Sequence, residues 1–303
     1  MKKELKNILV PVDFKEPSLK ALLYAKNLAN SINADIILLH VVSTPGWVAD
    51  FFTRGGELVD ITNSIKDKMS KLIENEFGKN SKVKVSSVVV RGKPYEEILK
   101  TAVELNVRMV ILGENHQGHD ANQTLGSTVY HVTLSSKVPV LTLKGDTQLM
   151  NKEIVVPLDL TKQNKKQLFS AIAYGLNYNA RIHLVSSLIG GIKMEESRIY
   201  QKLEEAKQTL EDNGVMSTIQ LFPRSEEPPF RHVIKYAKEV NAGMILLLTH
   251  KEGYTYDNYI GAFAHHIINK SSVPVLSLTS AATNVDFSKF LSSIVDPAGV
   301  LLK

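Results

Sequence analysis

The sequence predicts an α/β fold built from two consecutive parallel-sheet domains. Nearly continuous apolar runs of strand length recur along the chain, as at 7–12 and 35–42. Patterns of helical spacing separate these runs. Strands that are apolar throughout are typical of a parallel sheet covered by helices on both faces. The whole pattern begins again at Glu153, which predicts a second domain of the same architecture.

The first copy alternates strands and helices from end to end. Proline fits the first turn of a helix, so Pro94 marks the start of the third one. Glycine followed by serine at Gly126-Ser127 opens the fourth. The predicted order is strand 7–12, helix 21–32, strand 35–42, helix 58–73, strand 82–90, helix 94–103, strand 109–112, helix 127–135 and strand 139–143.

The second copy repeats the first at two constant offsets. KNILVPVDF is answered by KEIVVPLDL, which places Asp159 at the position of Asp13, 146 residues later. Further along the offset is 135 residues, so that Gly261 matches Gly126. The lost residues fall in the connection 43–56 of the first copy. This internal duplication predicts domains at 1–146 and 151–280, followed by a tail at 281–303 that has no counterpart.

Composition excludes several classes of protein. The 303 residues include 36 Lys and Arg against 31 Asp and Glu, a mild excess spread along the chain, so no nucleic-acid partner is expected. The absence of cysteine excludes disulfides, thiol catalysis and cysteine metal sites, and fits a reducing compartment. No apolar run approaches ~18 residues and the N-terminus lacks a signal-peptide core, so we expect no membrane span and a cytoplasmic protein.

The stretch from 107 to 143 has the layout of an anion site. A buried strand ends at Gly113, a connection follows, and Gly126-Ser127 begins a helix. The first N–H groups of a helix lack partners within it, and the helix dipole favours a negative charge there. This arrangement of strand, loop and helix can hold a phosphate.

Three segments give the chain a family resemblance. ILVPVDF, the GKP before the third helix, and VILGENHQGHDANQTLGSTVYHVTLSSKVPVLTL resemble the universal stress protein family, in two tandem copies. The resemblance implies Rossmann-like, adenine nucleotide alpha hydrolase-like domains, each with a five-stranded parallel sheet of order 3-2-1-4-5. Members pair through the fifth strand, which implies an intramolecular pseudo-dimer here and leaves room for a further homodimer.

The same resemblance implies a site for ATP or another adenine nucleotide in the first domain. Nucleotide-binding members carry G-x2-G-x9-G-[S/T] between the fourth strand and the last helix. The spacing is retained here, but the second glycine is replaced by His116. Aspartate after the first strand lies near the adenine or ribose in such members, and the end of the second strand lines the base. The positions that match are Pro11, Val12, Asp13, Val41, Gly113, His116, Gly126, Ser127, Thr128 and Val129.

Two alternatives remain open for these residues. An imidazole at His116 would occupy phosphate space, so the loop could instead be an inherited turn that has lost its ligand. Asp13 could cap the turn into the first helix rather than contact a ligand. In the second copy the motif becomes Leu248, Lys251 and Ala262, so no nucleotide is expected there in the family manner.

Two other groups of residues give only weak evidence of function. His116, His119 and Asp120 lie in one loop without a clear further ligand, so no metal site is predicted. Trp47 and the Phe51-Phe52 pair form an aromatic segment that could be a lid, a partner contact or local packing.

No catalytic motif for hydrolase, P-loop or zinc chemistry is present, so at most slow ATP hydrolysis is expected. The sequence thus predicts a regulatory or protective stress module. The alternative is an interaction protein without nucleotide that acts through dimer surfaces.

Overall fold

The computed structural model describes residues 6–43, 55–78, 81–114, 125–145, 151–160, 165–188, 197–249, 251–252 and 259–279. The chain divides into two compact units, one spanning Leu5–Asp146 and the other beginning at Thr147. His116, the aromatic segment around Trp47 and the tail 281–303 lie outside the described residues.

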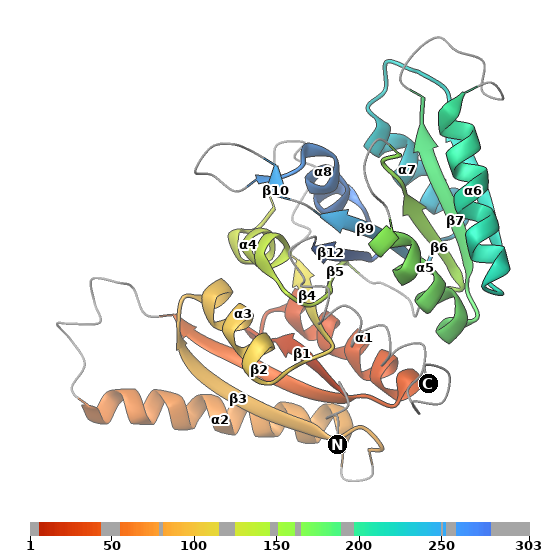
Figure 1. Cartoon of the computed structure of the whole chain (residues 1–303). Helices are drawn as coiled ribbons and strands as arrows, with labels where there is room; N and C mark the ends of the chain where they lie inside the picture. Colours follow the sequence, from red (N-terminus) through yellow and green to blue (C-terminus); the bar gives the residue numbers. More distant parts are fainter. Residues whose placement is uncertain are drawn as a thin grey trace. The chain divides into compact units, whose positions relative to one another are not determined.

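The first unit follows the predicted order of elements (Figure 1). Its strands are β1 (Asn7–Pro11), β2 (Asp35–Ser43), β3 (Val85–Gly92), β4 (Met109–Glu114) and β5 (Val140–Lys144). Its helices are α1 (Glu16–Ile32), α2 (Gly55–Phe77), α3 (Pro94–Glu104) and α4 (Ser127–Ser135). All strands pair in parallel in the order β3-β2-β1-β4-β5, which confirms the fold class.

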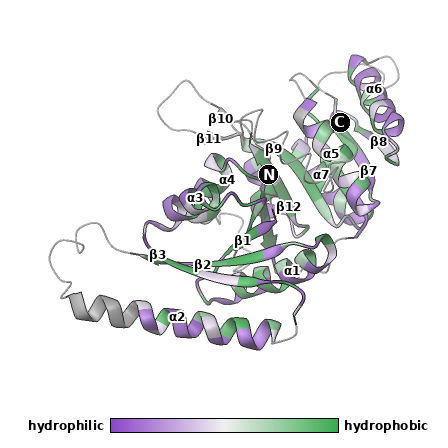
Figure 2. Cartoon of the chain, turned by 60° about the horizontal axis from the view of Figure 1, so that its bottom comes forward, coloured by the Kyte–Doolittle hydropathy of each residue, from purple (hydrophilic) through white to green (hydrophobic). Residues whose placement is uncertain are grey.

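The helices of the first unit cover both faces of its sheet. On one face α1 packs beside α2, where the Lys26 ammonium donates to the Glu76 carbonyl and lies over the Phe77 ring. On the other face α3 packs beside α4, and the rings of Tyr95 and His131 stack with centroids 4.5 Å apart. The central strands β1 and β4 are mainly apolar and buried (Figure 2), because helices cover both faces of the sheet there, whereas the edge strand β3 exposes Ser86 and Ser87.

The second unit repeats this architecture. Its strands are β6 (Glu153–Pro157), β7 (Arg181–Ser187), β8 (Ser217–Phe222), β9 (Met244–Thr249) and β12 (Val275–Thr279). Its helices are α5 (Lys165–Tyr178), α6 (Arg198–Asp212), α7 (Pro229–Glu239) and α8 (Ala262–Lys270). The parallel order β8-β7-β6-β9-β12 is that of the first unit, and a short antiparallel pair is added by β10 (Lys251–Glu252) and β11 (Tyr259–Ile260).

Left-handed asparagines mark the duplication in the backbone itself. Asn33 and Asn179 follow α1 and α5 with φ of 51° and 47°. Asn106 and Asn241 follow α3 and α7 with φ of 49° and 51°. These pairs lie 146 and 135 residues apart, the two offsets that the sequence repeat predicts. Asparagine tolerates this conformation better than other residues with a side chain, so both copies leave these helices by the same turn.

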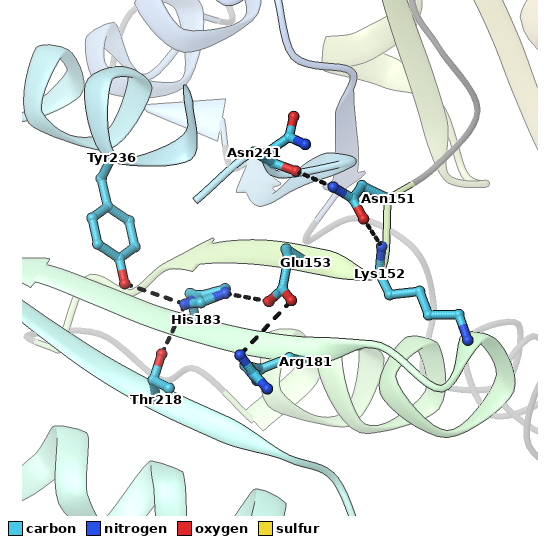
Figure 3. A network of polar contacts seen from close by, with 8 residues as sticks. All are labelled: Asn151, Lys152, Glu153, Arg181, His183, Thr218, Tyr236 and Asn241. Carbon is cyan, nitrogen blue, oxygen red and sulfur yellow. Dashed lines mark hydrogen bonds and ion pairs between the residues drawn. The ribbon is translucent and has the colours of Figure 1, made fainter. Parts of the chain in front are cut away.

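A polar cluster distinguishes the core of the second unit (Figure 3). His183, on β7, is buried, and its Nε2 lies 2.6 Å from Oε2 of Glu153. On its other side Nδ1 lies 2.8 Å from the Thr218 hydroxyl and 3.2 Å from that of Tyr236. Both ring nitrogens therefore have polar partners in this buried position. The matching residue of the first unit, 146 positions earlier, is the hydrocarbon side chain of Ile37.

Candidate functional site

A cavity of about 610 Å³ opens in the first unit where β1, β2 and β4 end. The strand order reverses between β1 and β4, and parallel α/β sheets bind ligands in the crevice at such a point. Seven of the ten predicted site residues line this cavity: Pro11, Val12, Asp13, Val41, Gly113, Thr128 and Val129. Lys15, Glu16, Pro17, Ser18, Leu39, Ser43, Pro94, Ile98 and Leu112 complete the described lining.

The remaining predicted residues are placed differently. Gly126 and Ser127 are exposed at the start of α4, directly before Thr128, and do not line the cavity. Gly126 is the N-cap residue of that helix, with φ of −56°, a backbone conformation open to any residue.

Asp13 shapes the turn that carries it. Its Oδ1 accepts the backbone N–H of Lys15 at 3.0 Å, and its own N–H donates to the hydroxyl of Ser18 at 3.2 Å. Lys15, not Asp13, is the N-cap residue of α1. Asp13 therefore caps the turn that precedes α1, but it does not cap α1 itself. The Asp13 side chain remains 57% exposed at the mouth of the cavity, where a ligand can reach it.

His40 supports the same turn, a role that the sequence did not indicate. Its Nδ1–H donates to the carbonyl of Val12 at 2.7 Å, since a carbonyl can only accept. Its ring lies 5.0 Å from that of Phe14, whose φ of 63° is left-handed. In the second unit the hydroxyl of Ser186 donates to the carbonyl of Leu158 at 2.9 Å. Both pairs lie 146 residues apart, so the two units fasten this turn in the same way.

Gly113 allows β4 and α1 to meet. A β-carbon built on it would lie 1.9 Å from the carbonyl oxygen of Pro17 and 3.0 Å from the backbone nitrogen of Ser18. Only a residue without a side chain permits this close backbone contact. The first glycine of the motif therefore has a packing role here, whatever its role toward a phosphate.

Glu114 joins the end of β4 to the start of α4. Its Oε1 accepts the backbone N–H of Gly126 at 3.0 Å. Its Oε2 lies 3.6 Å from Nζ of Lys144, directly across the β4–β5 register. The two side chains are 8% and 5% exposed, so this is a buried ion pair. Burial lowers the pKa of Lys144, and the charge of Glu114 partly offsets this effect.

Two basic residues shortly before or at the start of α3 are already engaged. Nζ of Lys93 donates to Oε1 of Glu96 at 3.1 Å, a contact that raises the pKa of Lys93 and lowers that of Glu96. Nη2 of Arg91 donates to the hydroxyl of Thr62 at 2.9 Å. These side chains are solvated partners of α2 and α3, as expected for exposed charges.

In the second unit a buried glutamine joins the two strands at the reversal of strand order. Gln167 of α5 is 2% exposed and donates from Nε2 to the carbonyls of Pro157 on β6 and Leu246 on β9, at 2.9 and 3.1 Å. These strands flank the reversal of order in this unit. The residue 146 positions earlier is Ala21, whose side chain cannot make these hydrogen bonds.

Among the described residues no group of three or more His, Asp or Glu side chains is arranged to hold a metal ion. No helix in those ranges is both long and apolar enough to cross a membrane.

Fold and site together define a doubly wound α/β protein with a cavity at the switch point of its first unit. Residues 4–144 match the family model described as the universal stress protein family. The first unit is thus a universal stress protein domain, as the sequence motifs predicted.

Relatives of known sequence match about half of the chain. Universal stress protein MJ0577 of Methanocaldococcus jannaschii is 29% identical over 153 residues, which is 46% of this chain and 94% of that protein. Universal stress protein YxiE of Bacillus subtilis is 28% identical over 144 residues, 45% of this chain and 97% of that protein.

A solved structure extends the likeness to both units. The crystal structure of a universal stress protein from Archaeoglobus fulgidus DSM 4304 has a TM-score of 0.75 with this chain at 18% identity. It covers 91% of this chain, and 99% of that protein is matched. At this identity the likeness concerns the fold alone, and it includes the second unit.

Proposed function

We propose that the first unit binds an adenine nucleotide in the cavity at the ends of β1, β2 and β4. The observation that carries this proposal is the convergence of seven predicted contact residues on one cavity. Its volume of about 610 Å³ lies within the range of small-molecule sites, which is roughly 300–1,000 Å³. The chain then acts as a cytoplasmic regulatory or protective module of the stress response, with ligand occupancy as its signal.

The lining separates into an apolar part and a polar part. Leu39, Val41 and Ile98 offer hydrocarbon surface to a base. Asp13 presents an exposed carboxylate that can accept from a ribose hydroxyl or an exocyclic amine. Thr128, at the start of α4, offers a hydroxyl and a helix N–H to an anionic group. This division fits a nucleotide with its base between β2 and α3 and its phosphate toward α4.

Filling the cavity tests the proposal. In Val41→Trp the indole occupies the space assigned to the base. The matched control is Ser187→Trp, the same strand position in the second unit, 146 residues later. Isothermal titration calorimetry with adenosine, AMP and ATP should show that Val41→Trp weakens binding by about tenfold or more, while Ser187→Trp retains it. Flat titrations of the unmodified chain at millimolar concentrations of all three ligands, without a thermal shift, would contradict the proposal.

A nucleotide retained through purification offers an independent check. Absorbance near 260 nm of the purified chain, and chromatography of what denaturation releases, would identify it. Recovery of an adenine compound from the unmodified chain and its loss from Val41→Trp would support the assigned site. Recovery from both proteins in equal amounts would place the ligand elsewhere.

A further inference from the structure

The structure also indicates which nucleotide the cavity prefers. Resting on the proposed function above, we propose that Glu114 makes the first unit selective for adenosine or AMP over ATP. This selectivity comes from a carboxylate of the protein that occupies the start of α4, where a chain of phosphates would need hydrogen-bond donors.

The start of α4 already has an anionic partner. The N–H of Gly126 is the donor that a phosphate would meet at the Gly-[S/T] end of the motif, and it donates instead to Oε1 of Glu114 at 3.0 Å. No side chain of the N-cap residue competes for it, because that residue is Gly126 itself. An ionised side chain at a helix N-terminus also offsets the positive end of the helix dipole. A ligand phosphate therefore finds one donor taken and a weaker attraction.

Neither partner of the Glu114–Gly126 contact lines the described cavity, whereas their neighbours Gly113 and Thr128 do. A group the size of one phosphate can approach Thr128 from the cavity. Further phosphates would have to extend past the Glu114–Gly126 contact, and each would bring additional negative charge toward a buried carboxylate. The penalty therefore increases from adenosine through AMP and ADP to ATP.

Lys144 does not cancel the repulsion between ligand phosphates and the Glu114 carboxylate. Its Nζ lies 3.6 Å from Oε2 of Glu114, its side chain is only 5% exposed, and it is not part of the described cavity lining. Its charge stabilises Glu114 within the sheet, where the ion pair is held between β4 and β5. The carboxylate, not the ammonium, meets the helix start, as its contact with Gly126 shows.

The second unit provides a natural uncharged version of this pair. At the same register positions of β9 and β12, 135 residues later, stand Thr249 and Thr279. Thr249 satisfies its own hydroxyl by donating to the carbonyl of Leu278 at 3.1 Å. Glycine is retained at the helix start as Gly261. The fold thus accepts threonine at both positions, which makes the double variant Glu114→Thr/Lys144→Thr a conservative test.

The experiment compares ligand preference rather than affinity alone. Calorimetric dissociation constants for adenosine, AMP, ADP and ATP are measured with the full chain and with the double variant. We expect the unmodified chain to bind AMP about tenfold more tightly than ATP, and the double variant to lose most of this difference. Glu114→Gln, which keeps the shape and an oxygen acceptor for Gly126, should reduce the difference without the second substitution.

Each outcome decides a separate question. Preference for ATP in the unmodified chain, or an equal AMP-to-ATP ratio in all three proteins, would overturn the role of Glu114 while leaving the nucleotide site intact. Absence of binding by any of the four ligands to any of the proteins would overturn the nucleotide site and this selectivity together. Should the double threonine variant fail to fold, Glu114→Gln/Lys144→Met replaces it, because it removes both charges together and keeps the approximate shape of both side chains.

Discussion

A β-carbon on Gly113 would lie 1.9 Å from the carbonyl oxygen of Pro17. This contact places the end of β4 against the first turn of α1 and thereby sets one wall of the cavity. Because the clash is with backbone on both sides, no rotamer change can relieve it. We predict that Gly113→Ala destabilises the chain by about 3 kcal/mol, measured as the free energy of unfolding in urea.

Gly126→Ala is the matched control for this substitution. Gly126 belongs to the same motif, but a β-carbon there would have its nearest neighbour 4.0 Å away, at Oε1 of Glu114. Its φ of −56° suits alanine equally well. We expect a change of less than about 0.5 kcal/mol. Equal losses in the two variants would show that the contact between Gly113 and Pro17 is not what requires glycine.

The buried ion pair should be much more sensitive to the loss of one partner than of both. Lys144→Met leaves the carboxylate of Glu114 buried without its cation, at an expected cost of about 3–5 kcal/mol. The double variant Glu114→Thr/Lys144→Thr removes both charges and should cost less than about 2 kcal/mol. Urea unfolding of both proteins at neutral pH measures the difference. A double variant that is less stable than Lys144→Met would contradict this account.

Because Lys144 is buried, we predict that the free energy of unfolding depends on pH. Burial lowers the pKa of Lys144 below the 10.5 of a free lysine. As pH rises, the folded chain releases this proton before the unfolded chain does, so the unfolded state binds more protons in the window just below pH 10.5. Stability contributed by this site therefore increases with pH in that window.

Comparison with the double variant isolates this effect from other alkaline titrations. The free energy of unfolding of the unmodified chain should rise relative to that of Glu114→Thr/Lys144→Thr between neutral pH and pH 10.5. Parallel pH profiles would show that Lys144 has the same proton affinity in both states. A relative fall would mean that its ion pair outweighs burial.

Sequence patterns were sufficient for the fold because the central strands are apolar along their length and helices such as α3 and α4 begin at a proline or a glycine-serine pair. The left-handed residues Asn33 and Asn179 lie 146 residues apart, which is the offset of the sequence repeat. Boundaries were less accurate: β3 begins at Val85 rather than 82, since Ser81 closes a turn with Val83 before it. That turn depends on the hydroxyl of Ser81, and the periodicity of apolar residues does not show where this side chain points.

The candidate site was only partly accessible to sequence reasoning. The motif spacing led to Gly113 and Thr128, but the ion pair of Glu114 and Lys144 depends on strand register, which the pattern of apolar residues does not give. The cluster around His183 in the second unit was missed for a similar reason. Its members come from different strands and from α7, and meet only in the folded sheet.

Substitution of His40 tests whether the turn around Asp13 matters for binding, and substitution of Ser186 in the second unit is the control. In His40→Ala the carbonyl of Val12 loses its donor and the ring of Phe14 loses its neighbour, so the turn that presents Asp13 to the cavity becomes less ordered. We predict a loss of about 1 kcal/mol in unfolding free energy. If the cavity binds a nucleotide, affinity should fall about fivefold, as measured by calorimetry with AMP.

Ser186→Ala removes the equivalent bond to Leu158 in the second unit. We expect a similar loss of stability from this substitution, because one side-chain donor to a turn carbonyl is lost in each case. AMP affinity should nevertheless remain that of the unmodified chain, since the turn it supports does not border the cavity of the first unit. If both variants weaken AMP binding equally, the effect of His40 reflects general destabilisation. If neither does, the order of the turn around Asp13 does not determine how the cavity holds its ligand.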